Sequence, residues 1–243
     1  MDVIRRIVAI VVVMGFFNLS SIAMAVSAEC DDALSILRKA KAYADSLSDY
    51  TLTLHKKERI KSSTGDEEVV TVKWKKPGWV YLKYLAGKNK GREILYVPGK
   101  YNNKMLVSSG GIFDGLTMRV SPDNAIVKMN SRHSITEAGM PKTIARIIDD
   151  IEKGAGDASS RMKVKMVGPE DREGNRCLHI RVIGSDYADR AEVFLYETSL
   201  LLAGISSYDD SDALIESFRY EEIKTNVGLS ESDFDSKNEA YHF

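Results

Sequence analysis

The chain has 243 residues, 44% of them hydrophobic, and carries 34 lysines and arginines against 35 aspartates and glutamates. This near-balance of charge argues against nucleic-acid binding driven by bulk charge and against a disordered acidic protein. With only 5 prolines and 17 glycines, the composition is that of an ordinary globular protein with enough apolar residues for a sizeable core.

The first 28 residues are typical of a secretory signal peptide. Arg5 and Arg6 precede an unbroken apolar run over residues 7–17, and small residues follow it. Cleavage is predicted after Ala25 or Ala28. An uncleaved membrane anchor is the alternative, but the apolar run is shorter than the roughly 20 residues that cross a bilayer. We therefore expect an exported, periplasmic protein without a stable transmembrane anchor.

The remaining chain, residues 29–243, is predicted to begin with a helix and to continue mainly as strands. Apolar residues recur at spacings of three and four over residues 31–47, which predicts an amphipathic helix. A second helix is predicted over residues 141–153, capped by Gly154, and residues 122–129 fit either a helical turn or a strand. Alternation of period two or short apolar runs between turn signals predict strands at 50–54, 70–75, 79–85, 92–97, 105–107, 116–120, 161–167, 177–183, 191–196, 200–208 and 215–224.

These strands follow one another without intervening helices over most of the chain. That order excludes parallel βαβ units and favours one large antiparallel sheet, so the predicted fold class is α+β. No domain boundary interrupts residues 29–243, and the acidic, polar tail from residue 228 to residue 243 is expected to extend along the surface.

Cys30 and Cys177 are the two cysteines of the chain. An exported protein meets an oxidising compartment, where two thiols can pair, so a Cys30–Cys177 disulfide is predicted. The alternative is two unrelated buried thiols, because a free cysteine is often a small core residue.

The sequence carries little that points to catalysis. Its four histidines, His55, His133, His179 and His242, fall on separate predicted elements, without the spacing of a metal site or a second cysteine nearby. Nucleophile elbows, phosphate-binding loops and dinucleotide fingerprints are also missing. We therefore predict a protein that is not an enzyme and needs no cofactor or metal, although distant residues can still converge into a triad.

The alternating strands place bulky apolar side chains on one face of the sheet. Two helices are too few to cover so wide a curved face, which predicts an open apolar groove; a closed core that binds nothing is the alternative. Lys56 and its basic neighbours are expected on a solvated strand face. The predicted ligand-binding residues are Leu52, Leu54, Val70, Val72, Trp74, Val80, Leu82, Tyr84, Met162, Val164, Met166, Leu178 and Ile180.

Several strings of the sequence resemble a known family. They are Y-T-L-T-L-H-K-K-E-R-I at 50–60, W-K-K-P-G-W-V-Y-L-K-Y at 74–84, G-R-E-I-L-Y-V at 91–97 and N-V-G-L-S-E-S-D-F-D at 226–235. These resemble domain of unknown function family 1571, exported bacterial proteins thought to share the LolA-like fold. The resemblance implies a half-barrel covered by helices, a place in the cell envelope and an open apolar cavity, but no demonstrated ligand.

Two functions fit this picture. In the first, the protein is a periplasmic, non-enzymatic carrier of lipids or lipoproteins whose acyl chains lie on the concave face of the half-barrel. In the second, the same sheet serves an envelope sensor or interaction module that binds a lipoprotein or a regulator's peptide. Near-neutral charge favours a ligand recognised by its apolar part over nucleic acid.

Overall fold

The computed structural model describes residues 30–110, 116–124, 131–157 and 159–243. The predicted signal peptide lies outside these residues, as does most of the ambiguous segment at 122–129. Within the described ranges, no helix is both long and apolar enough to cross a membrane.

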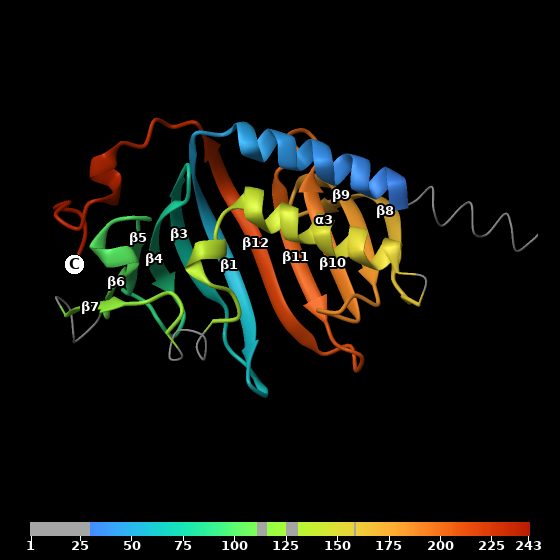
Figure 1. The fold of residues 1–243 in the computed structure, drawn as a ribbon, viewed down its shortest axis with the longest axis horizontal. Helices are drawn as coiled ribbons and strands as arrows, with labels where there is room; N and C mark the ends of the chain where they lie inside the picture. Colours follow the sequence, from blue (N-terminus) through green and yellow to red (C-terminus); the bar gives the residue numbers. More distant parts are fainter. Residues whose placement is uncertain (1–29, 111–115, 125–130, 158) are drawn as a thin grey trace, which may run out of the picture.

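The described strands form one antiparallel sheet in the order β7-β6-β5-β4-β3-β1-β12-β11-β10-β9-β8, with β2 paired to β1 outside this order (Figure 1). The α+β prediction is therefore confirmed. The strands are β1 Asp49–Ile60, β2 Ser63–Thr64, β3 Glu68–Lys75, β4 Trp79–Ala86, β5 Glu93–Tyr96, β6 Met105–Ser108, β7 Thr117–Val120, β8 Lys163–Arg172, β9 Asn175–Ile183, β10 Arg190–Tyr196, β11 Leu202–Tyr208 and β12 Leu214–Thr225.

The edge strand β8 continues further than the sequence predicted. It runs through Pro169 to Arg172, where a turn was expected, and Pro169 faces Leu178 of β9. A proline fits an edge strand because only one side of that strand is hydrogen-bonded. The register shifts between Met166 and Gly168, and such a bulge discourages further strands from pairing there.

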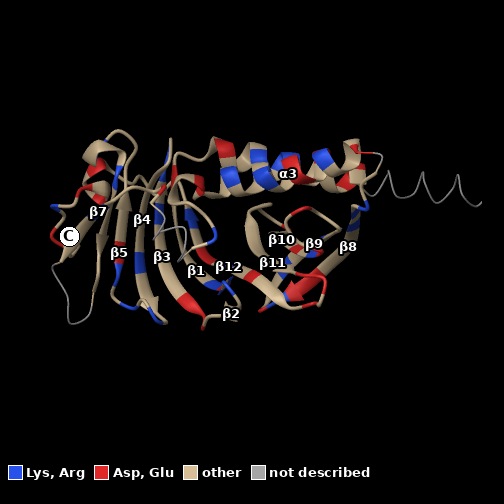
Figure 2. Ribbon diagram, turned by 60° about the horizontal axis from the view of Figure 1, so that its bottom comes forward, with Lys and Arg blue, Asp and Glu red and all other residues tan. Residues whose placement is uncertain are grey.

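Two α-helices of the described chain, residues 30–46 and α3 (Met140–Gly156), lie over the same face of the sheet (Figure 1). An Arg38–Glu152 ion pair of 2.6 Å joins them side by side. Charged residues of both signs recur along α3 (Figure 2). Its inner side presents Ile144, Ile148 and Ile151 to the core.

The predicted cap of the second helix is wrong, because Gly154 lies inside α3, which ends two residues later. A Cβ at Gly154 would stand 2.4 Å from the sulfur of Met162. The glycine therefore permits the close approach of the chain leading into β8, and does not end the helix.

The main core fills the space between the helices and the concave face of the sheet. It joins helix residues such as Leu37 and Ile144 to strand residues such as Val164, Ile180 and Val193. In Figure 1 both helices lie over the part of the sheet that runs from β12 to β8.

A second core lies on the convex face of β4 to β6, under the C-terminal tail. Tyr81, Leu95 and Leu106 pack there against Leu229 and Phe234, and the Phe234 side chain is fully buried. The short 3-10 helix η4 (Glu231–Phe234) carries this phenylalanine. The tail completes a core here that its polar composition did not predict.

Candidate functional site

A cavity of about 210 Å³ lies on the concave face, between the sheet and the segment that leads into α3. Three rows of side chains across the sheet form its floor. Leu52, Val72, Leu82 and Ile94 are paired neighbours on β1, β3, β4 and β5. The next row contains Tyr220, Leu54, Val70 and Tyr84, and the last contains Phe218 and Lys56.

Residues 131–140 form the roof of the cavity. The 3-10 helix η3 (Ile135–Glu137) lies within this segment, and the Ser134 side chain caps it by accepting a hydrogen bond from the Thr136 N–H. Ile135, Ala138 and Met140 contribute apolar surface to the cavity. The roof and floor together enclose a lining that is mainly apolar.

The cavity is closed at the Tyr50 end. The Tyr50 hydroxyl accepts a hydrogen bond of 2.9 Å from the Met140 N–H, and its ring stacks on Trp74 with centroids 5.0 Å apart. Gly139 has a φ of +118°, and a Cβ there would stand 2.5 Å from Trp74 Nε1. Burial raises the pKa of Tyr50 far above its ordinary value, so its hydroxyl stays neutral.

The other end of the cavity is charged. Lys56 Nζ lies 2.7 Å from Glu58 Oε2 and 3.8 Å from Glu68 Oε2. Burial lowers the pKa of Lys56, but Tyr84, Glu58 and Glu68 outweigh it and raise that pKa above its ordinary value. Lys56 therefore holds a full positive charge beside the apolar rows.

A chain of hydrogen bonds connects α3 to β12 at this charged end. Arg146 donates to His133 Nδ1 at 2.8 Å, and His133 Nε2 lies 2.8 Å from Glu216 Oε2. A guanidinium can only donate, so Nδ1 accepts and the Nε2–H donates to Glu216. Burial raises the pKa of Glu216, but hydrogen bonds from His133 and Tyr187 and the Arg146 charge hold it below its ordinary value.

Among the described residues, one group has the geometry to hold a metal ion: Glu58, His133 and Glu216 each offer a ligand atom within 4.8 Å of the others. Cationic side chains already engage these atoms. Lys56 pairs with Glu58, and Arg146 occupies the Nδ1 lone pair of His133. The cluster fits a network of internal ion pairs and hydrogen bonds better than a cation site.

The structure separates the predicted ligand-binding residues into two groups. The first group lines the cavity and contains Leu52, Leu54, Val70, Val72, Leu82 and Tyr84. Trp74 and Val80 are buried beside its closed end, and the β8 and β9 residues pack into the main core beneath the helices. This second group contains Trp74, Val80, Met162, Val164, Met166, Leu178 and Ile180.

Sequence reasoning missed part of the lining. Ile94 and Met105 lie on β5 and β6, and Phe218 and Tyr220 come from β12, which the sequence did not show to be a neighbour of β1. Lys56 was expected in solvent, yet it continues the alternation of Leu52 and Leu54 and so faces the cavity. That alternation is the signal that could have placed it.

The predicted disulfide is wrong, because both cysteines are free. Cys177 packs against Phe194 and Ala203 in a small cluster on the convex face. Cys30 contacts the main core from the first helix, on the concave side. The sheet therefore stands between the two thiols, and the alternation of β9 turns Cys177 away from the helices.

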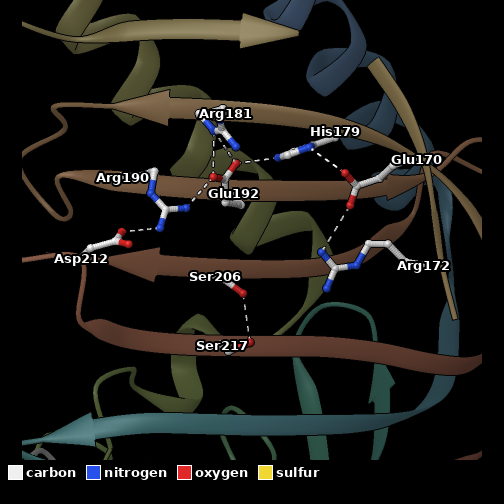
Figure 3. A network of polar contacts seen from close by, with 9 residues as sticks. All are labelled: Glu170, Arg172, His179, Arg181, Arg190, Glu192, Ser206, Asp212 and Ser217. Carbon is white, nitrogen blue, oxygen red and sulfur yellow. Dashed lines mark hydrogen bonds and ion pairs between the residues drawn. The ribbon is translucent and has the colours of Figure 1, made fainter. Parts of the chain in front are cut away.

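A network of polar side chains occupies the convex face of β8 to β10 (Figure 3). His179 contacts Glu192 at 2.6 Å and Glu170 at 3.1 Å, and Arg181 donates to Glu192 at 2.8 Å. Neither His179 nor His55 lines the cavity. The network ties neighbouring strands together on the side opposite the cavity, which is a structural role.

The chain was compared with protein families, curated proteins and solved structures. The family model described as "Protein of unknown function (DUF1571)" matches residues 47–243. No curated protein sequence matches the chain. The chain is similar to the solved structure of an uncharacterized conserved protein from Thermus thermophilus, with a TM-score of 0.51 and 9% identity over 84% of this chain and 92% of that one.

Two further structures show weaker likeness. The lipoprotein LppX of Mycobacterium tuberculosis has a TM-score of 0.48 and 12% identity, covering 83% of this chain and 97% of that one. A LolA superfamily protein from Nitrosomonas europaea has a TM-score of 0.39 and 10% identity, covering 83% and 96%. The described chain forms an open, curved antiparallel sheet with helices on its concave face, which is the half-barrel architecture that the sequence predicted.

Proposed function

The chain belongs to the DUF1571 family, and from its cavity we propose that it is a non-enzymatic carrier that binds a lipid acyl chain on the concave face of the half-barrel. The observation that carries the proposal is the cavity, whose floor of paired side chains from β1, β3, β4 and β5 is apolar over successive rows. Such a floor holds an acyl chain by burial of area, worth about 25 cal/mol per Å², without any directed bond.

The size of the cavity limits the ligand. Its volume of about 210 Å³ is below the roughly 300–1,000 Å³ of sites that enclose a drug-sized molecule. The closed cavity therefore suits one acyl chain. A lipoprotein carrying several chains would require the roof segment and α3 to move away from the sheet.

Polar contacts attach the roof to the sheet at both of its ends, and Arg132 adds hydrogen bonds from its backbone N–H to Glu58 (3.3 Å) and from its guanidinium to the Arg59 carbonyl (3.2 Å). Met140 N–H bonds to Tyr50 at one end, and the Arg146–His133–Glu216 chain connects the other end. We propose that these contacts hold the empty protein closed and that ligand entry breaks those at the charged end first.

The start of the sequence supports a proposal about where the protein acts. The basic residues, apolar run and small residues of positions 1–28 support export. We propose that the carrier acts in the periplasm, where lipids and lipoproteins in transit need their acyl chains shielded from water.

The test is a pair of leucine substitutions on β4. Leu82 lines the cavity, whereas Leu85 does not line it and is 44% exposed. Leu82→Trp fills the cavity, and Leu85→Trp adds the same bulk outside it. We expect delipidated wild-type protein and the Leu85→Trp variant to bind one equivalent of a fluorescent fatty acid, and Leu82→Trp to lose binding. Absence of binding to the wild type, or unchanged binding by Leu82→Trp, contradicts the proposal.

A further inference from the structure

The cavity changes in polarity along β1. The side chains of Tyr50, Leu52, Leu54, Lys56 and Glu58 all face it, in that order from the closed end to the charged end. At about 3.4 Å per residue, the apolar part from Tyr50 to Leu54 is about 14 Å long. A ligand with one apolar end and one polar end therefore has one favourable orientation, with its tail against Tyr50 and its head beside Lys56.

At the charged end, Lys56 and Arg146 have more N–H groups than the contacts they make. Among the described residues, the Lys56 ammonium has one close acceptor, Glu58 at 2.7 Å, and Glu68 lies further away at 3.8 Å. The Arg146 guanidinium gives one N–H to His133. Both residues line the cavity, and an ammonium and a guanidinium carry further N–H groups beyond these contacts.

The two buried carboxylates at this end are already engaged, whereas Glu137, which also lines the cavity, is exposed at the roof. Glu58 receives Lys56 and, at 3.3 Å, the Arg132 N–H, and Glu216 receives His133 at 2.8 Å. Burying a further donor or a cation here would leave it competing for occupied carboxylates. A ligand head group that accepts hydrogen bonds can instead use the remaining N–H groups of Lys56 and Arg146.

From this gradient we propose that the ligand is a single-chain amphiphile with a hydrogen-bond-accepting head, a carboxylate being the best match, bound tail first with its head between Lys56 and Arg146. This inference rests on the proposed function, since it assigns the chemical class and orientation of the ligand in the same cavity. The Lys56 ammonium supplies the strongest of the new contacts, because it is charged and largely removed from water.

The experiment compares three amphiphiles with the same tail and different heads. Dodecanoate, dodecanol and dodecyltrimethylammonium are titrated calorimetrically into delipidated protein. Each is titrated into the wild type, Lys56→Gln and the matched control Lys57→Gln, whose position on β1 faces the other side of the sheet. Dodecanol has no charge to lose, so its binding reports whether each variant keeps an intact cavity.

We expect dodecanoate to bind the wild type at least about tenfold more tightly than the ammonium compound. Lys56→Gln should weaken dodecanoate binding about tenfold and leave dodecanol binding within about twofold, whereas Lys57→Gln should change neither. If all three heads bind alike, or if Lys56→Gln leaves dodecanoate binding unchanged, the assignment of the head is overturned and the carrier proposal stands. If none of the three binds, the carrier proposal itself is overturned.

Discussion

The Tyr50 hydroxyl accepts a hydrogen bond of 2.9 Å from the backbone N–H of Met140, the first residue of α3. The first N–H groups of a helix lack partners within the helix, and this one is satisfied by a side chain from the sheet below. Gly139, which occupies the N-cap position, provides no side chain to do this. The contact thus both caps α3 and closes the inner end of the cavity.

Tyr50→Phe should destabilise the protein by about 1–3 kcal/mol, because the Met140 N–H then remains buried without an acceptor. The free energy of unfolding in urea measures the loss. Tyr43→Phe on the first helix is the matched control, since Tyr43 is 40% exposed, and it should change stability by less than about 0.5 kcal/mol. Equal stability of the Tyr50→Phe variant and the wild type would show that the contact does not hold α3.

Gly139→Ala should cost about 1–3 kcal/mol of stability. The positive φ of Gly139 disfavours any side chain, and the added Cβ would meet Trp74 Nε1 at 2.5 Å. Gly156→Ala is the control, because Gly156 ends the same helix and a Cβ there meets nothing within 4 Å. It should be neutral or slightly stabilising. Thermal unfolding of both variants separates them, and a similar effect of the two substitutions would contradict this account of the closed end.

Glu216 should contribute stability that depends on pH. Its pKa in the folded protein lies below the ordinary value of 4.5, so the folded state favours the charged form. The contribution is complete above the ordinary pKa and is lost as pH falls through the lowered one. Glu216→Gln should therefore be less stable than the wild type near neutral pH, and the difference should shrink by about pH 3.

Urea unfolding at several pH values measures that difference. The control is Glu231→Gln, whose side chain is 78% exposed in the tail, and its difference from the wild type should stay small throughout. A Glu216→Gln deficit that remains constant down to about pH 3 would show that the native contacts of Glu216 do not favour its charged form.

The two cysteines should titrate as free thiols. Denatured, unreduced protein is expected to react with two equivalents of a thiol reagent per chain, because the sheet separates Cys30 from Cys177. In the folded protein Cys177 should react much more slowly than Cys30, since it is fully buried and Cys30 is partly exposed. Burial also raises the pKa of both thiols, which slows each reaction. Detection of no thiol in the denatured chain would restore the disulfide.

The sequence predicted which residues share a face of the sheet, but not which part of that face stays open. Leu52, Val72 and Leu82 alternate with polar residues, so period two was enough to place them together. The same pattern in Val164 and Ile180 leads to a filled core, because helix residues such as Ile144 pack there. Periodicity contains no information about where along a wide sheet a helix is placed.

The charged end of the cavity depends on contacts between distant segments. His133, Arg146 and Glu216 come from the roof, from α3 and from β12, and no spacing in the sequence relates them. Lys56 is different, because its alternation with Leu54 already predicts that it faces the concave side. The basic composition of the segment predicted that Lys56 lies in solvent. The period-two alternation of the strand predicts its position in the structure correctly.

Whether the cavity holds an acyl chain is best tested by photo-crosslinking with a dodecanoic acid that carries a diazirine at the far end of its tail. After irradiation, mass spectrometry of peptides locates the attached lipid. Tail-first binding in the cavity predicts attachment near its closed end, at Tyr50, Leu52 or Val72. Attachment confined to the convex face, or none that unlabelled dodecanoate competes away, would contradict the claim that this cavity holds an acyl chain.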